Sequence, residues 1–116
     1  MPKKTNRRIF TFEEACRLLP EIRERTDRAL REIREMDVAF DGDEEDTSGT
    51  EPSETEADRV LLAWARDIEA LGIEVKGPWL VDFDSGAGYY CWRWPEESLE
   101  YFHGYDEGFT GRIRLQ

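Results

Sequence analysis

Apolar residues recur at helical spacing along the first third of the chain. The pattern repeats every seven residues at two positions, one holding Phe12, Leu19, Thr26, Ile33 and Phe40 and the other Ala15, Ile22, Ala29 and Met36. This spacing predicts one long amphipathic helix. Thr11-Phe-Glu-Glu14 has the form of a capping box at its start, in which each side chain binds the other residue's backbone amide. Pro20 lacks an amide hydrogen and clashes one turn back, which predicts a kink or break near Leu18–Pro20.

A second apolar stripe predicts a helix from about Glu54 to Leu71, with Gly72 placed to cap its end. The apolar positions of this stripe are Ala57, Val60, Leu61, Trp64, Ile68 and Leu71. Two striped helices joined by a flexible connection are expected to form an antiparallel hairpin. Because both stripes are apolar and the first keeps a seven-residue repeat, the helices could pack on the chain's own sheet or pair with a second subunit.

Between the two predicted helices, residues 41–54 are acidic and rich in Gly, Ser and Thr, with no apolar side chain. Such a segment buries too little apolar surface to offset its ordering entropy, which predicts a mobile linker. Residues 37–58 hold ten of the 27 acidic residues and no Lys or Arg, so the net charge of −11 belongs to this region. The 17 acidic residues elsewhere nearly balance the 16 basic ones. We therefore expect a basic arm over residues 1–9 and a single domain over residues 10–116 that contains the linker.

The last third of the chain alternates apolar and polar residues between turn signals, which predicts antiparallel strands. The two expected turns are Ser85–Gly88 and Pro95–Ser98. If each turn is a four-residue connection, Asp84 faces Tyr89 and Trp94 faces Leu99. One face then collects the residues Trp79, Val81, Phe83, Tyr90, Trp92, Trp94, Leu99 and Tyr101. We expect this face to pack on the helices, with His103 on the same side.

The opposite face of the predicted sheet holds Leu80, Asp82, Cys91, Arg93, Glu100 and Phe102. We expect this second face to be wetter, with Asp82 and Arg93 directed outward and Arg93 opposite Glu100. A register slip of one residue would invert these assignments. The predicted fold class is α+β, with a long helical hairpin packed on a small three- to four-stranded antiparallel sheet.

The order of several short motifs resembles one prokaryotic family. The motifs are Phe10-Thr-Phe-Glu-Glu-Ala-Cys-Arg-Leu-Leu-Pro20, Leu80-Val-Asp-Phe83, Cys91-Trp-Arg93, Glu96, Tyr101-Phe-His103 and Gly108-Phe-Thr-Gly-Arg112. On these residues the chain is similar to the domain of unknown function 2203, over everything but the acidic linker. It departs from the family at Pro95, where the family tends to carry Gly, and at Phe102, where it tends to carry Trp. The resemblance implies a fold and a domain extent, and it carries no activity.

The C-terminal region also holds the residues from which a site could be built. The candidate ligand-binding residues are Asp82, Arg93, Glu96, His103, Asp106 and Arg112. Donor types suited to a transition-metal ion occur at Cys91, Glu96, His103, Asp106 and Glu107, with His103 and Glu96 as the candidate metal pair. Alternatively, His103 is tied to a carboxylate or carbonyl at the edge of the aromatic core. Arg112 could bind an anion through its two-pronged guanidinium, or pair with Asp106 or Glu107.

The remaining features narrow the classes of function. No apolar run reaches the length of a membrane span, and the N-terminus lacks the apolar stretch of a signal peptide. Two cysteines without CxxC spacing predict reduced thiols in the cytoplasm. The short basic arm and the acidic linker argue against nucleic-acid binding. We expect a small cytoplasmic binding or assembly module that self-associates through its helix stripes. The alternative is a metal- or ligand-dependent enzyme centred on His103 and Glu96, whose cofactor the sequence does not identify.

Overall fold

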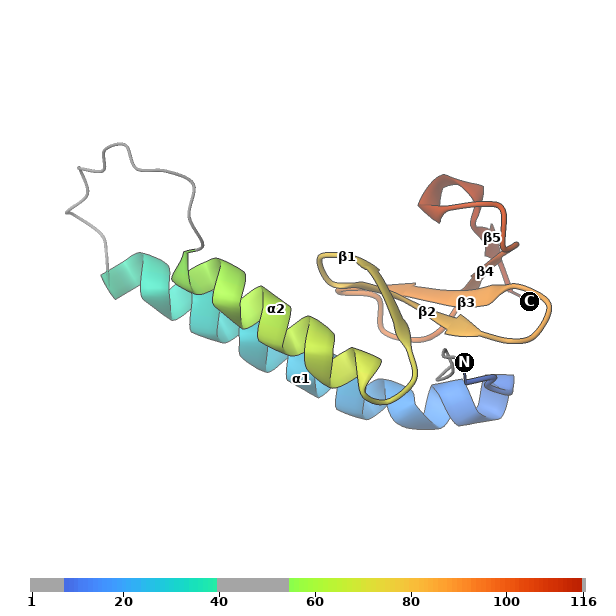
Figure 1. Ribbon diagram of the computed structural model, residues 1–116, viewed down its shortest axis with the longest axis horizontal. Helices are drawn as coiled ribbons and strands as arrows, with labels where there is room; N and C mark the ends of the chain where they lie inside the picture. Colours follow the sequence, from blue (N-terminus) through green and yellow to red (C-terminus); the bar gives the residue numbers. More distant parts are fainter. Residues whose placement is uncertain (1–7, 40–54, 116) are drawn as a thin grey trace, which may run out of the picture.

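The computed structural model describes residues 8–39 and 55–115 and has the predicted α+β fold. The elements in chain order are α1 (Phe12–Ala39), α2 (Glu56–Glu69), β1 (Glu74–Gly77), β2 (Leu80–Asp84), β3 (Tyr89–Arg93), β4 (Tyr101–His103), the 3₁₀ helix η1 (Phe109–Gly111) and β5 (Ile113–Arg114). The strands form one antiparallel sheet in the order β1-β2-β3-β4-β5. Figure 1 shows the helices on one side of this sheet and η1 on the other.

The described residues leave two predictions untested and bear on two others. The predicted linker over residues 41–54 and residues 1–7 of the basic arm lie outside the described part of the chain. Within the described ranges, no helix combines the length and the apolar character that crossing a membrane requires. Both cysteines are free, as the absence of paired spacing predicted.

The first helix begins with the predicted capping box and runs through Pro20 without interruption. The Glu14 amide donates to Thr11 Oγ1 at 3.0 Å, and the Thr11 amide donates to Glu14 Oε1 at 3.0 Å. Of the kink or break predicted near Leu18–Pro20, the break is therefore wrong, since the helix is continuous. Pro20 lies on the exposed face, where water can bind the carbonyl that loses its amide partner. The buried side chains of Leu19 and Ile22 on the other face hold the helix in place.

The two helices form the predicted antiparallel hairpin, and one polar residue in the apolar stripe links them. Trp64 Nε1 donates to Thr26 Oγ1 at 2.9 Å, and the Thr26 hydroxyl donates to the Ile22 carbonyl at 2.8 Å. Both Thr26 and Trp64 are buried, so this pairing satisfies an indole N–H that would otherwise lose its water. The second helix begins at Glu56, two residues later than predicted, because Thr55 caps it with Asp58 in a second capping box.

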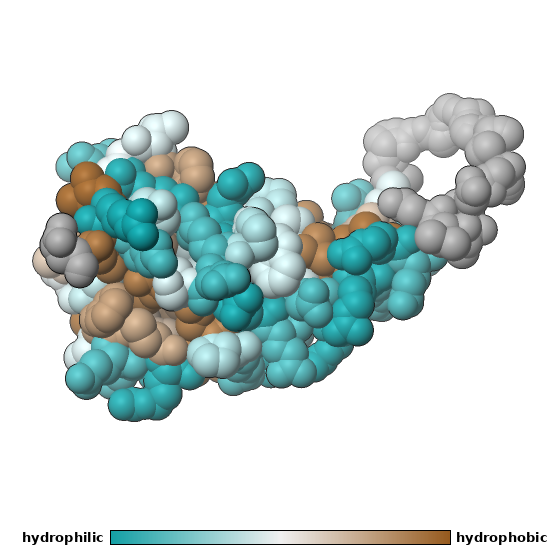
Figure 2. All heavy atoms as spheres, turned by 180° about the vertical axis from the view of Figure 1, so that it is seen from behind, coloured by the Kyte–Doolittle hydropathy of each residue, from teal (hydrophilic) through white to brown (hydrophobic). Residues whose placement is uncertain are grey.

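The half of the hairpin that carries the end of α1 and the start of α2 projects beyond the sheet (Figure 1). The other half packs on the first face of the sheet. Figure 2 shows hydrophilic side chains over much of the projecting half, with an apolar band between them.

The first face of the sheet is the core face, as predicted for β2 and β3. Val81, Phe83 and Trp92 are fully buried against apolar residues of both helices. Phe10 contacts Phe83 edge to face, with ring centroids 5.4 Å apart. The β2–β3 register is the predicted one, with Asp84 opposite Tyr89. These contacts place the hydrophobic core between the sheet and the helical hairpin.

The predicted register between β3 and β4 is wrong by one residue. Cys91 pairs with Tyr101, and Tyr89 pairs with His103. The connection spans residues 94–100 instead of four residues, and Glu96 organises it. Its backbone carbonyl accepts from Trp92 Nε1 at 2.8 Å, and its Oε1 accepts from the Arg93 amide at 2.9 Å. Because cross-strand partners share a face, the corrected register moves His103 to the second face.

The second face is buried, which corrects the prediction of a wet surface. Asp82 and Cys91 are both buried, although Arg93 is exposed as predicted. The chain after β4 folds back over this face, and its last residues add β5, the fifth strand, beside β4. The predicted pairing of Arg93 with Glu100 is replaced by a salt bridge from Arg114 to Glu100 at 3.0 Å. The residues after β4 thus bury part of the second face of the sheet, which would otherwise be exposed to solvent.

Candidate metal centre

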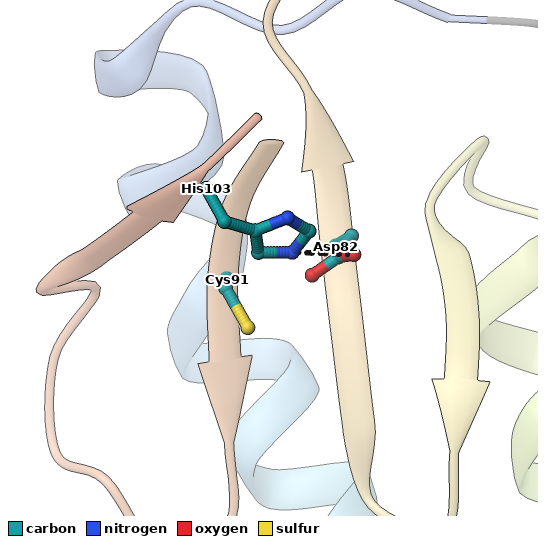
Figure 3. Close-up of side chains that lie close together, drawn as sticks. All are labelled: Asp82, Cys91 and His103. Carbon is teal, nitrogen blue, oxygen red and sulfur yellow. Dashed lines mark hydrogen bonds and ion pairs between the residues drawn. The ribbon is translucent and has the colours of Figure 1, made fainter. Parts of the chain in front are cut away.

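Three neighbouring strands each contribute one buried side chain to a single cluster on the second face of the sheet. Asp82 comes from β2, Cys91 from β3 and His103 from β4, and Figure 3 shows the three side chains together. Asp82 pairs directly with Cys91, while His103 pairs with Tyr89, two residues before Cys91. The alternation of side chains along a strand therefore places all three on one face. Their donor atoms lie within 4.8 Å of one another.

The two polar contacts of His103 orient its ring and show that Nδ1 carries a hydrogen. Nδ1 lies 2.9 Å from the Gly104 carbonyl, which can only accept, so Nδ1 carries a hydrogen. Nε2 lies 3.0 Å from Asp82 Oδ2. In the neutral form of the ring, Nε2 would direct a lone pair at a carboxylate oxygen, so a proton or a cation is needed between these two atoms. The geometry provides a place for a positive charge.

Asp82 is the least satisfied member of the cluster. Its second oxygen, Oδ1, is buried and has no hydrogen-bond partner in the described part of the chain. Burial raises the pKa of the Asp82 carboxyl, and the neighbouring His103 and Cys91 offset that rise only in part. The carboxylate interacts with His103 and with the Cys91 side chain, but a buried oxygen that lacks a donor of its own is costly.

The Cys91 thiol is not an activated nucleophile. Burial raises its pKa to about 12, and the adjacent Asp82 carboxylate adds to the rise. A catalytic thiol needs the opposite, a depressed pKa beside a base. Both nitrogens of His103 face oxygen atoms, so neither serves as that base. The cluster does not have the arrangement of a Cys-His-Asp acyl-transfer site.

The same donors suit a zinc ion. Carboxylate oxygen, thiolate sulfur and imidazole nitrogen all bind Zn²⁺ at about 2.0–2.3 Å, and a tetrahedral arrangement sets ligand atoms roughly 3.3–3.6 Å apart. The three donor atoms lie within 4.8 Å of one another, so they would have to move closer together to hold such an ion. The Gly104 carbonyl already orients His103 in the way that outer-sphere partners orient metal-ligating histidines.

A pocket of about 330 Å³ adjoins the cluster. Besides the three cluster residues, its lining comprises Lys76, Leu80, Glu107, Gly108 and Phe109. Lys76 Nζ lies 3.1 Å from Glu74 Oε1 and 4.5 Å from the centroid of the Tyr89 ring. Glu107 Oε1 accepts from the Gly104 amide at 2.9 Å, which ties the C-terminal segment to the end of β4. The cluster therefore opens on a space that a small molecule can occupy.

The structure brings Asp82 and His103 together but places Glu96 and Arg112 in a separate contact. Arg112 Nη2 pairs with Glu96 Oε2, which corrects the predicted pairing of Arg112 with Asp106 or Glu107. The Arg112 guanidinium also stacks over the Tyr101 ring, 3.8 Å from its centroid. Glu96 is thus held by Arg112 and by the connection after β3, and it is not a member of the cluster.

Two further candidates, Arg93 and Asp106, have exposed side chains and are not members of the cluster. The sequence names Cys91 among the possible metal donors but does not place it in the candidate pair His103 and Glu96. The sequence does indicate that Cys91 lies beside Asp82, because the correctly predicted β2–β3 register sets the two residues opposite each other. The placement of His103 depended on the β3–β4 connection, whose length the sequence pattern did not reveal.

Cys91 should react much more slowly with thiol reagents than Cys16 does. Cys16 is only partly buried, whereas Cys91 is buried and its pKa is about 12. We expect Cys16→Ser protein to label at least about tenfold more slowly than Cys91→Ser protein, because attack requires an accessible thiolate. A colorimetric disulfide reagent at mildly alkaline pH, without added metal, measures both rates. Equal rates would mean that Cys91 is not enclosed as described.

Together these observations define a class, an α+β protein with a buried Asp–Cys–His cluster beneath a C-terminal cover. Comparison with protein-family models then identifies the family. The model for the "Uncharacterized conserved protein (DUF2203)" family matches residues 8–115, and the chain belongs to that family. The resemblance inferred from the sequence motifs is confirmed. No curated protein matches the chain, and no solved structure does.

Proposed function

We propose that this protein binds a divalent transition-metal ion, Zn²⁺ in the cytoplasm, through Asp82, Cys91 and His103. The observation that carries the proposal is the orientation of His103, whose Nδ1 is held by a backbone carbonyl while Nε2 points at a carboxylate oxygen beside a thiol. Imidazole and thiolate ligands favour zinc-like ions over Mg²⁺ and Ca²⁺, which prefer oxygen ligands alone.

Charge supports the same assignment. A carboxylate and a thiolate together carry two negative charges, so a divalent ion leaves the buried cluster with no net charge. The ion also gives Asp82 Oδ1 a partner that the described residues do not provide. With its pKa raised to about 12, the Cys91 thiol is protonated without metal, so the group that an ion would compensate is the buried Asp82 carboxyl.

Three protein ligands leave one position of a tetrahedral ion free for water or a small molecule. The pocket lined by Lys76, Glu107 and Phe109 lies beside the three ligands and provides the space for such a molecule. This favours a metal-dependent binding protein or enzyme over a purely structural zinc site. The sequence pattern suggested His103 and Glu96 as the centre of the site. The proposed site uses Asp82, Cys91 and His103 instead. A reducing compartment suits a site that needs a free thiol, which supports a cytoplasmic location.

Cobalt substitution tests the proposal directly. Co²⁺ takes the place of Zn²⁺ and gives an intense near-ultraviolet band when a thiolate is a ligand. We expect this band at one equivalent of Co²⁺ in the wild-type protein, and its loss on addition of one equivalent of Zn²⁺.

The chain supplies its own matched control in the second cysteine. Cys16→Ser should keep the cobalt band, since Cys16 lies outside the cluster, whereas Cys91→Ser should lose it. Circular dichroism checks that both variants are folded. A wild-type protein without the band, or a band that survives in Cys91→Ser, would overturn the proposal.

A further inference from the structure

The pocket beside the proposed metal site contains one acidic side chain that the cluster does not use. Glu107 lines this pocket of about 330 Å³ together with Asp82, Cys91 and His103. It is not one of the three residues whose donor atoms lie within 4.8 Å of one another. Glu107 therefore shares the cavity with the three proposed ligands without being a fourth one.

Backbone on two sides holds Glu107 in place. Its Oε1 accepts from the Gly104 amide at 2.9 Å, and the Gly104 carbonyl lies 2.9 Å from Nδ1 of His103. A Cβ added to Gly111 would lie only 2.8 Å from the Glu107 Cβ, so the turn of η1 packs directly against the stem of this side chain. The segment that orients the proposed histidine ligand thus also places the acid.

This arrangement suits a contact between Glu107 and the ion through one water molecule. A water in the open position of a zinc ion lies about 2.1 Å from the metal, as other oxygen ligands do. Its hydrogen bond of about 2.7 Å then reaches an acceptor that stands beyond ligand distance. A general base needs to be within hydrogen-bond reach of the proton that it takes. A carboxylate that lines the pocket but is not a ligand suits that role.

The other polar residues around the pocket are not suited to take a proton. Burial by itself would lower the pKa of Lys76, but the hydrogen bond and the charge of Glu74 raise it above its usual value, so Lys76 keeps its positive charge. The three residues of the cluster would be bound to the ion through their own donor atoms. Among the described residues that line the pocket, Glu107 is therefore the base that remains.

We infer that this site hydrolyses a small acyl ester, with Glu107 as the base that takes a proton from the ion-bound water. The inference rests on the proposed metal site. The water oxygen bonds to the carbonyl carbon of the ester while one of its protons passes to Glu107. The ion stabilises the negative charge that develops on the carbonyl oxygen. The ester C–O bond then breaks, and the leaving oxygen takes the proton from Glu107, so that an acid and an alcohol are released.

The walls of the pocket indicate the kind of acyl group. Leu80 and Phe109 are the apolar residues of the lining, and Phe109 belongs to η1 in the segment that covers the second face. Contact between these two side chains and a small apolar acyl group would bury apolar surface on both. A volume of about 330 Å³ limits the substrate to a small molecule.

Hydrolysis of para-nitrophenyl acetate, an activated ester, by the full chain loaded with one equivalent of Zn²⁺ tests the inference. We expect a rate that exceeds those of the metal-free protein and of free Zn²⁺. Glu107→Gln should lower this rate by about a hundredfold, because general base catalysis contributes about 10²–10⁴-fold and the amide cannot accept the proton. A protein that shows the cobalt–thiolate band but no zinc-dependent hydrolysis would overturn the inference and leave the metal site standing.

Asp106→Asn is the matched control. Asp106 is the neighbouring acid in the chain, is exposed, and does not line the pocket. The variant removes the same charge and should keep the rate within about twofold of the wild type. Equal losses in the two variants would overturn the role of Glu107, since the effect would then come from the charge of the segment as a whole.

Azide binding to the cobalt-loaded protein gives a readout that does not depend on catalysis. This small anion occupies an open position of Co²⁺ and changes its visible absorption. We expect Glu107→Gln to bind azide at least about threefold more tightly than the wild type, because a like charge beside that position is removed. The azide affinity of Asp106→Asn should not change.

Unchanged azide affinity in Glu107→Gln would place the carboxylate away from the ion and overturn the inference. A missing cobalt–thiolate band would instead overturn the metal site on which the inference rests.

Discussion

Replacement of His103 by alanine is expected to weaken Zn²⁺ binding by about a hundredfold or more. Loss of a partner that only orients a ligand already costs about 10–100-fold in affinity, and loss of a ligand itself should cost at least as much. His103 is the proposed ligand with the most restricted orientation, because the Gly104 carbonyl holds its Nδ1 at 2.9 Å. Competition against a chromophoric chelator measures the affinity of each variant.

Glu96→Gln provides the control for this experiment. Glu96 is an acid at the opposite end of the same connection, and sequence reasoning paired it with His103. In the structure its oxygens bind Arg112 and the Arg93 amide, so its charge is used away from the cluster. We expect the zinc affinity of Glu96→Gln to stay within about threefold of the wild type. A larger loss for Glu96→Gln than for His103→Ala would return the centre to Glu96 and contradict the cluster.

Replacement of Phe83 by alanine is expected to lower the free energy of unfolding by about 3–5 kcal/mol. Phe83 has no exposed surface and lies between β2 and the helices, where its ring meets Phe10 edge to face. The substitution removes a buried ring and leaves a cavity that the surrounding helices can close only in part. Denaturant unfolding followed by tryptophan fluorescence measures the change.

The same substitution at Phe12 isolates the contribution of burial. Phe12 is 42% exposed and contacts one ring, that of Tyr90, at a centroid distance of 5.4 Å. We expect Phe12→Ala to cost less than about 1.5 kcal/mol, because much of its ring stays in water in the folded protein. Similar costs at both positions would mean that the core does not lie where the structure places it.

The segment that covers the second face of the sheet makes the polar cluster a suitable place for the proposed metal site. Donors that remain in water bind metal in competition with hydration, whereas these three lie beneath the segment that follows β4. Glu107 holds that segment through the Gly104 amide, next to the carbonyl that orients His103. The cover and the orientation of the ligand thus depend on the same few residues at the end of β4.

The amino-acid sequence by itself determined the elements and much of their packing. Heptad spacing and the capping box at Thr11 specify α1, because these signals are local and act within a few residues. The alternation in β2 and β3, with a turn at Ser85–Gly88, also determined that Asp82 lies opposite Cys91. No break occurs at Pro20, because the cost of proline to the helix depends on which face is exposed, and a local pattern does not weigh that cost against packing.

Tertiary structure alone decided where His103 lies and whether the second face is wet. A strand has a side-chain period of two, so one residue more or less in the connection after Arg93 exchanges the two faces of β4. That length follows from how Glu96 bonds to Trp92 and Arg112, groups that come together only in the folded chain. The burial of Asp82 likewise depends on residues 104–115 crossing the sheet, a contact between segments that no periodic pattern connects.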